Sequence, residues 1–540
     1  MNDTPSLNAT WSRRQIFRAA RALGLGALVP GAASAAQPSR TAARPPTPPT
    51  VDGRDLYAQL GVRPIINARG TLTIIGGSME LPEVREAKSA ANQQYVNLEE
   101  LMEAAGGKLA ALTQAEWGMV SSGCAAAMSH ATAACVAGGN PDLHVRIPDL
   151  RGFAKTEVII PGHSRNVYDA AIRAVGVSIV EANTPEELAL AIGPKTAMIY
   201  VFANPRNESG PMSLEAIAAV ARPHGVPILV DAAAEILTVP SIHLQRGATM
   251  VCYSGGKIIR GPQSAGVLLG RKDLVKAAWI HSAPHHGYAR SMKVGREEVV
   301  GMLVAIESWV TRDHAAEWAE WVRRADEIAE AAQRVSGVTA IVAREPWEDR
   351  SNRSPRVTLR WTAAALGLTG QQAADILYEG EPRIAIGGAA DRAREGMPGD
   401  AGIALTTSML APGDARIVGE RLRAVLAGPH TLKRQPAPTA PAGDVTGTWR
   451  AEIVFAASRS THVLHLRQRD GRIEGTHQGD FLARDVVGAI DGSRVTLASR
   501  VTERTGDALN YRFTADLSGD TLTGTIDMGE YRAATWTASR

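Results

Sequence analysis

The sequence predicts an α/β fold with a mostly parallel sheet, then a smaller α+β domain, then a C-terminal antiparallel β-barrel or sandwich. In the first half, apolar strands alternate with helical segments: 156–161 before 168–176, 197–203 before 213–225, and then 226–231. Strands joined through helices run parallel and are buried on both faces. Helical sequence over 298–332, followed by strand patterns at 337–343 and 355–361, predicts the smaller domain.

The segment 444–540 follows another pattern. Its runs alternate between apolar and polar residues and are broken by the turn sequences 469-RDGR-472, 490-IDGS-493 and 518-SGDT-521. Period-two alternation with regular turns predicts antiparallel strands. We count about eight strands, which is enough to close a small up-and-down barrel.

Composition sets the expected domain boundaries. A chain of 540 residues is too long for one hydrophobic core. Two proline-rich tracts bracket the main body and predict linkers. The expected order is a signal peptide (1–36), a spacer (37–50), an N-terminal segment that packs with the small domain (51–95), a large domain (96–296), the small domain (297–428), a second linker (429–443) and the β domain (444–540).

Charge and cysteine content narrow the class of protein. The net charge is +3, so no basic surplus indicates a nucleic-acid partner. The three cysteines, Cys124, Cys135 and Cys252, lack metal-ligand spacing. Their apolar surroundings predict buried free thiols.

The N-terminus carries a targeting pattern. Paired arginines, Arg13 and Arg14, precede a weakly apolar run and the small-residue site 33-ASA-35. This pattern predicts twin-arginine export to the periplasm or beyond; the alternative is a disordered basic tail. The run is shorter than the roughly 20 apolar residues that cross a bilayer, so we expect no stable membrane anchor.

One lysine lies in an unusual loop, 254-SGGKIIRGPQ-263. A lysine that forms a Schiff base needs a fixed position, partial desolvation and room for a flat cofactor. Gly255 and Gly256 give Lys257 that room. Taken alone, the loop is better explained as a plain turn, so the other requirements of such a site must be found elsewhere in the sequence.

Other segments offer what pyridoxal phosphate requires. Asp231 ends the apolar run 226–231, where a carboxylate can hold the proton of the pyridine nitrogen, although it could also cap a helix. Ser122, Gly123 and Cys124 stand between a strand and an alanine-rich helix, where amides favour a phosphate, although a routine turn has the same pattern. Lys257, Asp231 and this loop together predict a pyridoxal phosphate site.

Two further residues follow predicted strands. His163 could stack on the pyridine face, although a lone histidine is commonly incidental. Asn204 could bond the phenolic oxygen of the cofactor, although an Asn-Pro pair also forms turns. His281, His285 and His286 have no acidic or thiol ligand beside them, so we expect no metal there.

Three motifs carry a family resemblance: GHxxxxYDxAIRxxG at 162–176, SGGKxxRGPQxxGxLxGRKDL at 254–274, and 290-RSMKVGREEVVGMLVAIE-307. Together they resemble the fold type I pyridoxal phosphate enzymes around selenocysteine synthase and D-glucosaminate-6-phosphate ammonia-lyase, an aminotransferase class V-like group. The likeness covers about residues 55–428.

The resemblance implies roles for particular residues. Lys257 becomes the Schiff-base lysine and Asp231 the partner of the pyridine nitrogen. The residues implied at the phosphate are Ser122, Gly123 and Ser254. Arg260, Arg290 and Lys293 are implied near the substrate, although a solvated basic turn also explains the last two. Enzymes of this fold work as homodimers or larger homo-oligomers, and Arg290 and Lys293 could reach a neighbouring subunit's cofactor.

The resemblance also implies a reaction. A small amino acid or amino-sugar acid would displace Lys257 to form an external aldimine, and the freed amine would remove the α-proton. β-Elimination with release of ammonia makes a lyase the first expectation. The alternatives are a selenocysteine synthase-like transferase or an aminotransferase, and a non-catalytic secreted binding protein. An export signal stands where selenocysteine synthase has a region for tRNA, which argues against a tRNA substrate.

Overall fold

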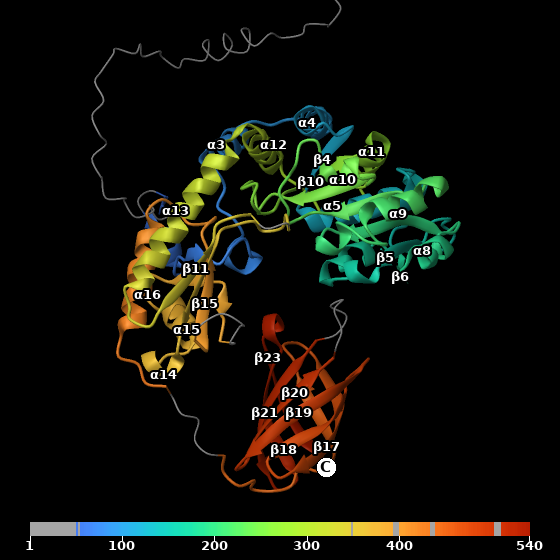
Figure 1. Ribbon diagram of the computed structural model, residues 1–540. Helices are drawn as coiled ribbons and strands as arrows, with labels where there is room; N and C mark the ends of the chain where they lie inside the picture. Colours follow the sequence, from blue (N-terminus) through green and yellow to red (C-terminus); the bar gives the residue numbers. More distant parts are fainter. Residues whose placement is uncertain (1–49, 52–53, 347–348, 392–398, 433–437, 502–508) are drawn as a thin grey trace, which may run out of the picture. The chain divides into compact units, whose positions relative to one another are not determined.

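The computed structural model describes residues 50–540, except for 52–53, 347–348, 392–398, 433–437 and 502–508 (Figure 1). The predicted signal peptide and nearly all of the spacer therefore lie outside the described residues. Among the described helices, none combines the length and the apolar character that a membrane span requires.

The large domain is built on a seven-stranded sheet with the order β4-β10-β9-β8-β7-β5-β6. β10 is antiparallel to both of its neighbours, and the other pairings are parallel, which confirms the predicted mostly parallel sheet. The strands are β4 (Trp117–Ser121), β5 (Glu157–Pro161), β6 (Ser178–Ala182), β7 (Thr196–Phe202), β8 (Ile228–Asp231), β9 (Met250–Ser254) and β10 (Gly266–Gly270).

Helices pack against this sheet. Nearly every residue of α5 (Cys124–Ala137) is buried, which explains its alanine-rich sequence, because small side chains let a helix lie close to a sheet. Other helices of this part include α4 (Leu98–Thr113), α8 (Pro185–Ala191), α9 (Leu214–Ala221) and α11 (Lys272–Ile280). Cys124 and Cys252 are buried free thiols as predicted, whereas Cys135, in the last turn of α5, keeps part of its surface exposed.

The smaller domain has a four-stranded sheet with the order β11-β12-β15-β14. Its strands are β11 (Thr339–Ala343), β12 (Arg356–Trp361), β14 (Gly388–Ala389) and β15 (Ala401–Thr406); its helices include α13 (His314–Gln333), α15 (Gly370–Glu379) and α16 (Asp414–Ala427). A separate parallel pair joins β13 (Ile384–Ile386) to β3 (Ile66–Ala68). The N-terminal segment is thus paired with strand residues from this part of the chain.

The C-terminal segment forms a closed antiparallel barrel, which confirms the predicted barrel (Figure 1). Along β16 buried and exposed residues alternate, because successive side chains point into and out of the barrel. Trp449, Phe513 and Trp536 fill much of the interior. The strands are β16 (Gly447–Val454), β17 (Arg459–Arg469), β18 (Arg472–Gln478), β19 (Ala483–Asp491), β20 (Arg494–Arg500), β21 (Tyr511–Ser518), β22 (Thr521–Asp527) and β23 (Ala533–Ser539).

Candidate active site

The predicted site residues meet at one edge of the large sheet. Ser121, Asp231 and Ser254 are the last residues of β4, β8 and β9, which all run in the same direction. Ligands of open α/β sheets bind at this carboxyl edge. Lys257 follows three residues after β9, and Asp231 pairs with Cys252 in the sheet, so both belong to the same edge.

Asp231 is a deeply buried carboxyl group, 2% exposed. Its Oδ1 accepts bonds from the Ala233 amide at 3.0 Å and from the Cys124 thiol at 3.6 Å, while its Oδ2 accepts a bond from the Tyr200 hydroxyl at 3.0 Å. Burial raises the pKa of Asp231, and these donors act in the opposite direction. A fixed carboxylate of this kind suits a cationic partner.

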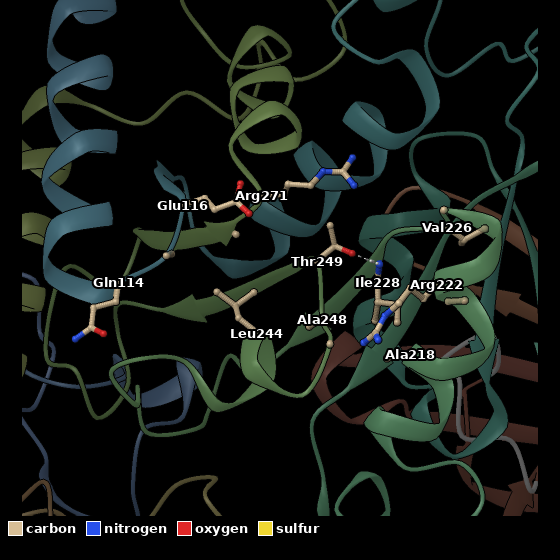
Figure 2. A pocket seen from close by; sticks show the side chains of 15 residues that line it. Gln114, Glu116, Ala218, Arg222, Val226, Ile228, Leu244, Ala248, Thr249 and Arg271 are labelled. Carbon is tan, nitrogen blue, oxygen red and sulfur yellow. Dashed lines mark hydrogen bonds between the residues drawn. The ribbon is translucent and has the colours of Figure 1, made fainter.

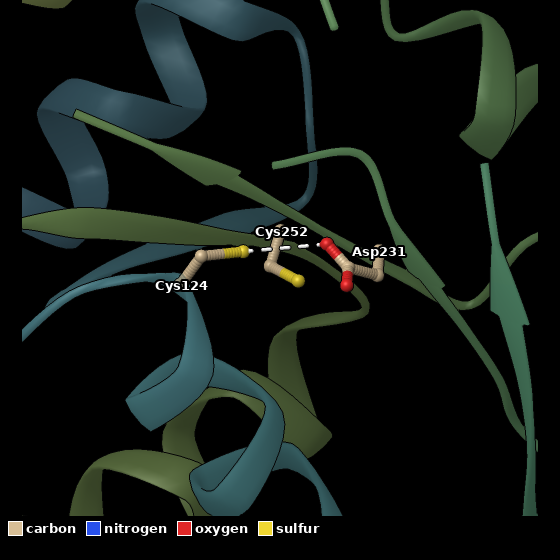
Figure 3. Close-up of side chains that lie close together, drawn as sticks. All are labelled: Cys124, Asp231 and Cys252. Carbon is tan, nitrogen blue, oxygen red and sulfur yellow. Dashed lines mark hydrogen bonds between the residues drawn. The ribbon is translucent and has the colours of Figure 1, made fainter. Parts of the chain in front are cut away.

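A small group of sulfur and oxygen atoms surrounds that carboxyl. The two thiol sulfurs and a carboxylate oxygen lie within 4.8 Å of one another; they belong to Cys124, Cys252 and Asp231, which are all buried (Figure 3). Burial and the neighbouring Cys252 raise the pKa of Cys124 well above its usual value. Cys124 therefore acts here as a neutral hydrogen-bond donor to Asp231.

The lysine loop is held by short-range contacts. Gly255 donates to the Ala265 carbonyl at 2.8 Å, and Gly261 donates to the Gly255 carbonyl at 2.9 Å. A Cβ atom at Gly255 would lie 2.6 Å from the Pro262 carbonyl oxygen. Glycine is required at position 255 because another part of the backbone lies too close for any side chain.

Lys257 itself is half-buried, and its Nζ donates to the Thr71 carbonyl oxygen at 2.9 Å. Burial lowers the pKa of Lys257, while Cys124 and Asp231 oppose that shift. A lowered pKa makes the neutral, nucleophilic amine more accessible near neutral pH. The N-terminal segment also contacts this loop at Ser78, whose amide donates to the Gly256 carbonyl at 3.1 Å.

The phosphate loop leads into a helix N-terminus. Gly123 precedes α5 with φ of 93°, a left-handed value that glycine adopts without strain. The first amides of α5 have no partner within the helix and favour an anion. Ser122 Oγ donates to the Met292 carbonyl at 2.9 Å, which brings the segment with Arg290 and Lys293 beside this loop.

His163 lies just beyond β5, and its Nε2 is 2.7 Å from Asn207 Nδ2. Burial, with a contribution from Arg206, lowers the pKa of His163, so the ring is neutral and accepts the amide hydrogen. Asn204 uses its side chain locally: Oδ1 accepts from the Arg206 amide at 2.9 Å and Nδ2 donates to the Phe202 carbonyl at 2.7 Å. In the structure, the side chain of Asn204 thus stabilises a turn. Its contact with the phenolic oxygen of a cofactor stays a prediction.

The basic residues predicted near a substrate differ in setting. Arg260 has φ of 61° and donates from Nε to the Met79 carbonyl at 3.2 Å, and burial lowers its pKa. Arg290 and Lys293 are exposed. Their predicted roles at the substrate stay predictions.

The histidines at positions 281, 285 and 286 do not share a partner. His281 Nδ1 lies 2.6 Å from His144 Nδ1, and His285 Nε2 lies 2.9 Å from Glu99. His286 is exposed. Among the described residues the three rings therefore do not converge on one point.

Two cavities are lined by other residues than the predicted site residues. One of about 460 Å³ is lined by residues at the start of β8 and before β9, including Thr249, whose Oγ1 accepts a bond from the Ile228 amide at 3.0 Å (Figure 2). It belongs to the amino edge of the parallel strands. The other, about 750 Å³, is lined by Trp309, Trp318 and Ile258, the neighbour of Lys257. Neither Lys257 nor Asp231 lines either cavity.

The donor set fits pyridoxal phosphate. A half-buried amine of lowered pKa can capture an aldehyde, a buried carboxylate can hold a cationic ring nitrogen, and the amino end of a helix can hold a phosphate. Sequence reasoning missed Tyr200, Thr71 and Asn207. Tyr200 sits inside the apolar run 196–202, where nothing in the sequence marks it as polar in function.

Comparison with known proteins agrees with this reading. The aminotransferase class-V model matches residues 165–287. The chain is 31% identical over 383 residues to D-glucosaminate-6-phosphate ammonia lyase of Salmonella typhimurium, covering 69% of this chain and 98% of that protein. It is 33% identical over 344 residues to a 5'-C-glycyluridine monooxygenase-decarboxylase of a Streptomyces species, covering 61% and 83%.

A solved structure of a D-glucosaminate-6-phosphate ammonia-lyase superposes with a TM-score of 0.60 at 29% identity, over 69% of this chain and 98% of that one. Both the sequence and the fold thus match one enzyme over nearly its whole length. The chain therefore belongs to the fold type I pyridoxal phosphate-dependent enzymes, in the group that includes D-glucosaminate-6-phosphate ammonia lyase.

Proposed function

We propose that this enzyme is a lyase that removes ammonia from a small amino acid or amino-sugar acid. Bound pyridoxal phosphate supplies an aldehyde that captures amines and a ring that accepts electrons. One observation carries the proposal: Lys257, whose amine has a lowered pKa, and the buried carboxyl of Asp231 lie at the same edge of the sheet. The name of the ammonia lyase relative supports the reaction class.

Lys257 is the proposed general base. Its lowered pKa leaves a larger fraction of neutral amine near neutral pH, so Nζ can take a proton from the substrate α-carbon. The Thr71 carbonyl, 2.9 Å from Nζ, orients the amine. Close packing at Gly255 fixes the backbone from which this side chain extends.

The carboxyl of Asp231 is the proposed partner of the ring nitrogen. Its bonds from Tyr200 and Ala233 favour the ionised form, which burial disfavours. A cationic ring nitrogen would complete that stabilisation, since a buried charge is expensive without a partner. The amides at the start of α5, with Ser122 and Gly123, are the proposed phosphate site.

A second reaction has support from the other relative. Its name, 5'-C-glycyluridine monooxygenase-decarboxylase, indicates that this relative decarboxylates its substrate. The transferase reaction stays an alternative because the family model that matches residues 165–287 is that of the class-V aminotransferases. All three share proton or carboxyl loss next to the amine, so the products decide among them.

The test is a product assay with a spectrum. The purified enzyme is loaded with pyridoxal phosphate and mixed with amino acids and amino-sugar acids, while visible absorbance, ammonia and keto acid are followed. We expect one substrate to shift the absorbance and to release ammonia and keto acid in equal amounts. Lys257→Ala should abolish both signals, and Lys276→Ala, at an exposed lysine bonded to Glu103, should leave them unchanged.

Other products would assign the reaction differently. Carbon dioxide release indicates decarboxylation, and transfer of the amine to an added keto acid indicates a transferase. Absence of any Lys257-dependent signal across the panel contradicts the lyase.

We also propose export through the twin-arginine route and assembly into a homodimer or larger homo-oligomer. The paired arginines support export, and the exposed Arg290 and Lys293 beside the phosphate loop support a contribution to a neighbouring subunit's site. Replacing Arg13 and Arg14 by lysine should retain the protein in the cytoplasm, as measured by cell fractionation. Equal periplasmic amounts of both forms would contradict export by this route.

A further inference from the structure

Four polar side chains lie inside the barrel at one end. They lie near the start of β17, the end of β18, the start of β19 and the end of β20. Because neighbouring strands are antiparallel, all four lie at the end of the barrel that carries the loops 479–482 and 528–532. We name this end the mouth and the four residues the mouth cluster: His462, His477, Arg484 and Ser499, which are 2%, 0%, 9% and 0% exposed. The other buried side chains of the described barrel are hydrophobic, with Tyr511 among them.

Three members of the mouth cluster form a hydrogen-bonded chain. His462 Nδ1 is 2.8 Å from His477 Nε2, and His477 Nδ1 is 2.8 Å from Ser499 Oγ. The far nitrogen, His462 Nε2, is buried and has no hydrogen-bond partner among the described residues. The Asp480 carboxylate is close to it: Oδ2 lies 3.5 Å from His462 Nε2, while the other oxygen, Oδ1, accepts a bond from Ser460 Oγ at 2.5 Å.

Arg484 carries a nearly buried positive charge. Its Nε donates to the Leu509 carbonyl at 2.9 Å and its Nη1 to the Leu482 carbonyl at 3.2 Å, and the guanidinium lies 5.0 Å from the centre of the Tyr511 ring. Among the described residues no carboxylate pairs with it. A buried charge held only by neutral groups is costly, and an anion would relieve that cost.

Arg484 is packed against its neighbours. His477 pairs directly with Arg484 across β18 and β19. A Cβ atom at Gly479 would lie 2.7 Å from Arg484 Nη1 and 3.6 Å from His462 Cε1, so a larger residue at 479 would displace the guanidinium. Phe481, in the same loop, is 93% exposed and offers an apolar surface at the rim.

We propose that the mouth of the barrel binds a small molecule through an oxyanion, a carboxylate or a phosphate, held by Arg484 and by His462 Nε2. Guanidinium groups bind both anions with two parallel bonds. The anion requires His462 to carry its hydrogen on Nε2. His462 Nδ1 then accepts from His477 Nε2, and His477 Nδ1 accepts from the Ser499 hydroxyl, so each polar group in the chain gains a partner.

Calorimetric titration of the full-length, cofactor-loaded enzyme tests this site. The probes are benzoate, inorganic phosphate, and benzamide, which has the shape of benzoate without its charge. We expect an anion to bind and benzamide to bind at least roughly ten-fold more weakly. Arg484→Gln should weaken anion binding by roughly ten-fold or more, whereas Arg512→Gln, the same change at an exposed arginine on the same barrel, should not.

The outcomes distinguish a carboxylate ligand from a phosphate ligand, and a binding role of Arg484 from a structural one. Tighter binding of benzoate identifies a carboxylate ligand, and tighter binding of phosphate identifies a phosphate ester. Equal binding of benzoate and benzamide, no binding of either anion, or equal affinities of the two arginine variants overturns the proposal. If Arg484 only ties its two loops together, Arg484→Gln lowers stability and leaves anion binding intact. Should that variant fail to fold, His462→Leu decides, because it removes the Nε2 donor, and unchanged anion affinity there also overturns the site.

Discussion

Replacing Tyr200 by phenylalanine removes one donor from the buried carboxyl of Asp231. The hydroxyl lies 3.0 Å from Oδ2, and Asp231 is 2% exposed, so water cannot replace the bond. A hydrogen bond to a charged group contributes about 1.5–3 kcal/mol. If the ionised carboxyl holds the ring nitrogen, Tyr200→Phe weakens pyridoxal phosphate binding by roughly ten- to a hundred-fold, because 1.4 kcal/mol corresponds to about a factor of ten.

The matched control is Tyr253→Phe. Tyr253 is equally buried, but its hydroxyl lies 3.2 Å from Ser241 Oγ and does not bond Asp231. Both variants lose the hydrogen bond of a buried tyrosine hydroxyl, so a difference in cofactor affinity isolates the effect on Asp231. The assay titrates the apoenzyme with pyridoxal phosphate and follows its absorbance. Equal cofactor affinities for the two variants would refute this role of Asp231.

Three other predictions follow. Burial raises the pKa of Asp231 from 3.8, so its contribution to apoenzyme stability is present below pH 3.8 and is lost as pH rises through the folded-state pKa. The Asp231→Asn variant keeps a neutral side chain at every pH. Its unfolding free energy, measured with urea, should therefore rise relative to that of the native apoenzyme as the pH increases from 3.8 through the folded-state pKa. A difference that stays constant with pH would contradict this prediction. Gly255→Ala should lose about 1–3 kcal/mol, since its Cβ meets a carbonyl at 2.6 Å, whereas Gly193→Ala, with no atom within 4 Å, should change little in the same assay. His163→Leu should weaken cofactor binding by roughly two- to ten-fold if the ring stacks on pyridoxal phosphate, and an unchanged affinity would remove that role.

The parts of the fold that could be predicted are those with a regular pattern of apolar and polar residues along the chain. Alternating strands and helices gave the parallel sheet, and period-two runs with turns gave the barrel, because both patterns are local. Asp231 and the loop before α5 were found because each ends an apolar strand, and such ends gather at one edge of a parallel sheet. The chemistry of pyridoxal phosphate related Lys257 to these positions, and the family resemblance then supported that relation.

The contacts that sequence reasoning missed depend on distant segments. Thr71 meets Lys257 although 186 residues separate them, and no local pattern foretells that pairing. Tyr200 reaches Asp231 because β7 and β8 are neighbours in the sheet, which the order of the chain does not specify. The partly exposed side chain of Cys135 likewise depends on where α5 ends against its surroundings.

The most direct measurement asks which amine holds the cofactor. The loaded enzyme is treated with borohydride, which converts an imine into a stable secondary amine, and its peptides are mapped by mass spectrometry. The account predicts that the pyridoxyl group is found on Lys257 and is absent from the Lys257→Ala variant. A pyridoxyl group on another lysine, or none on a fully loaded protein, would contradict it.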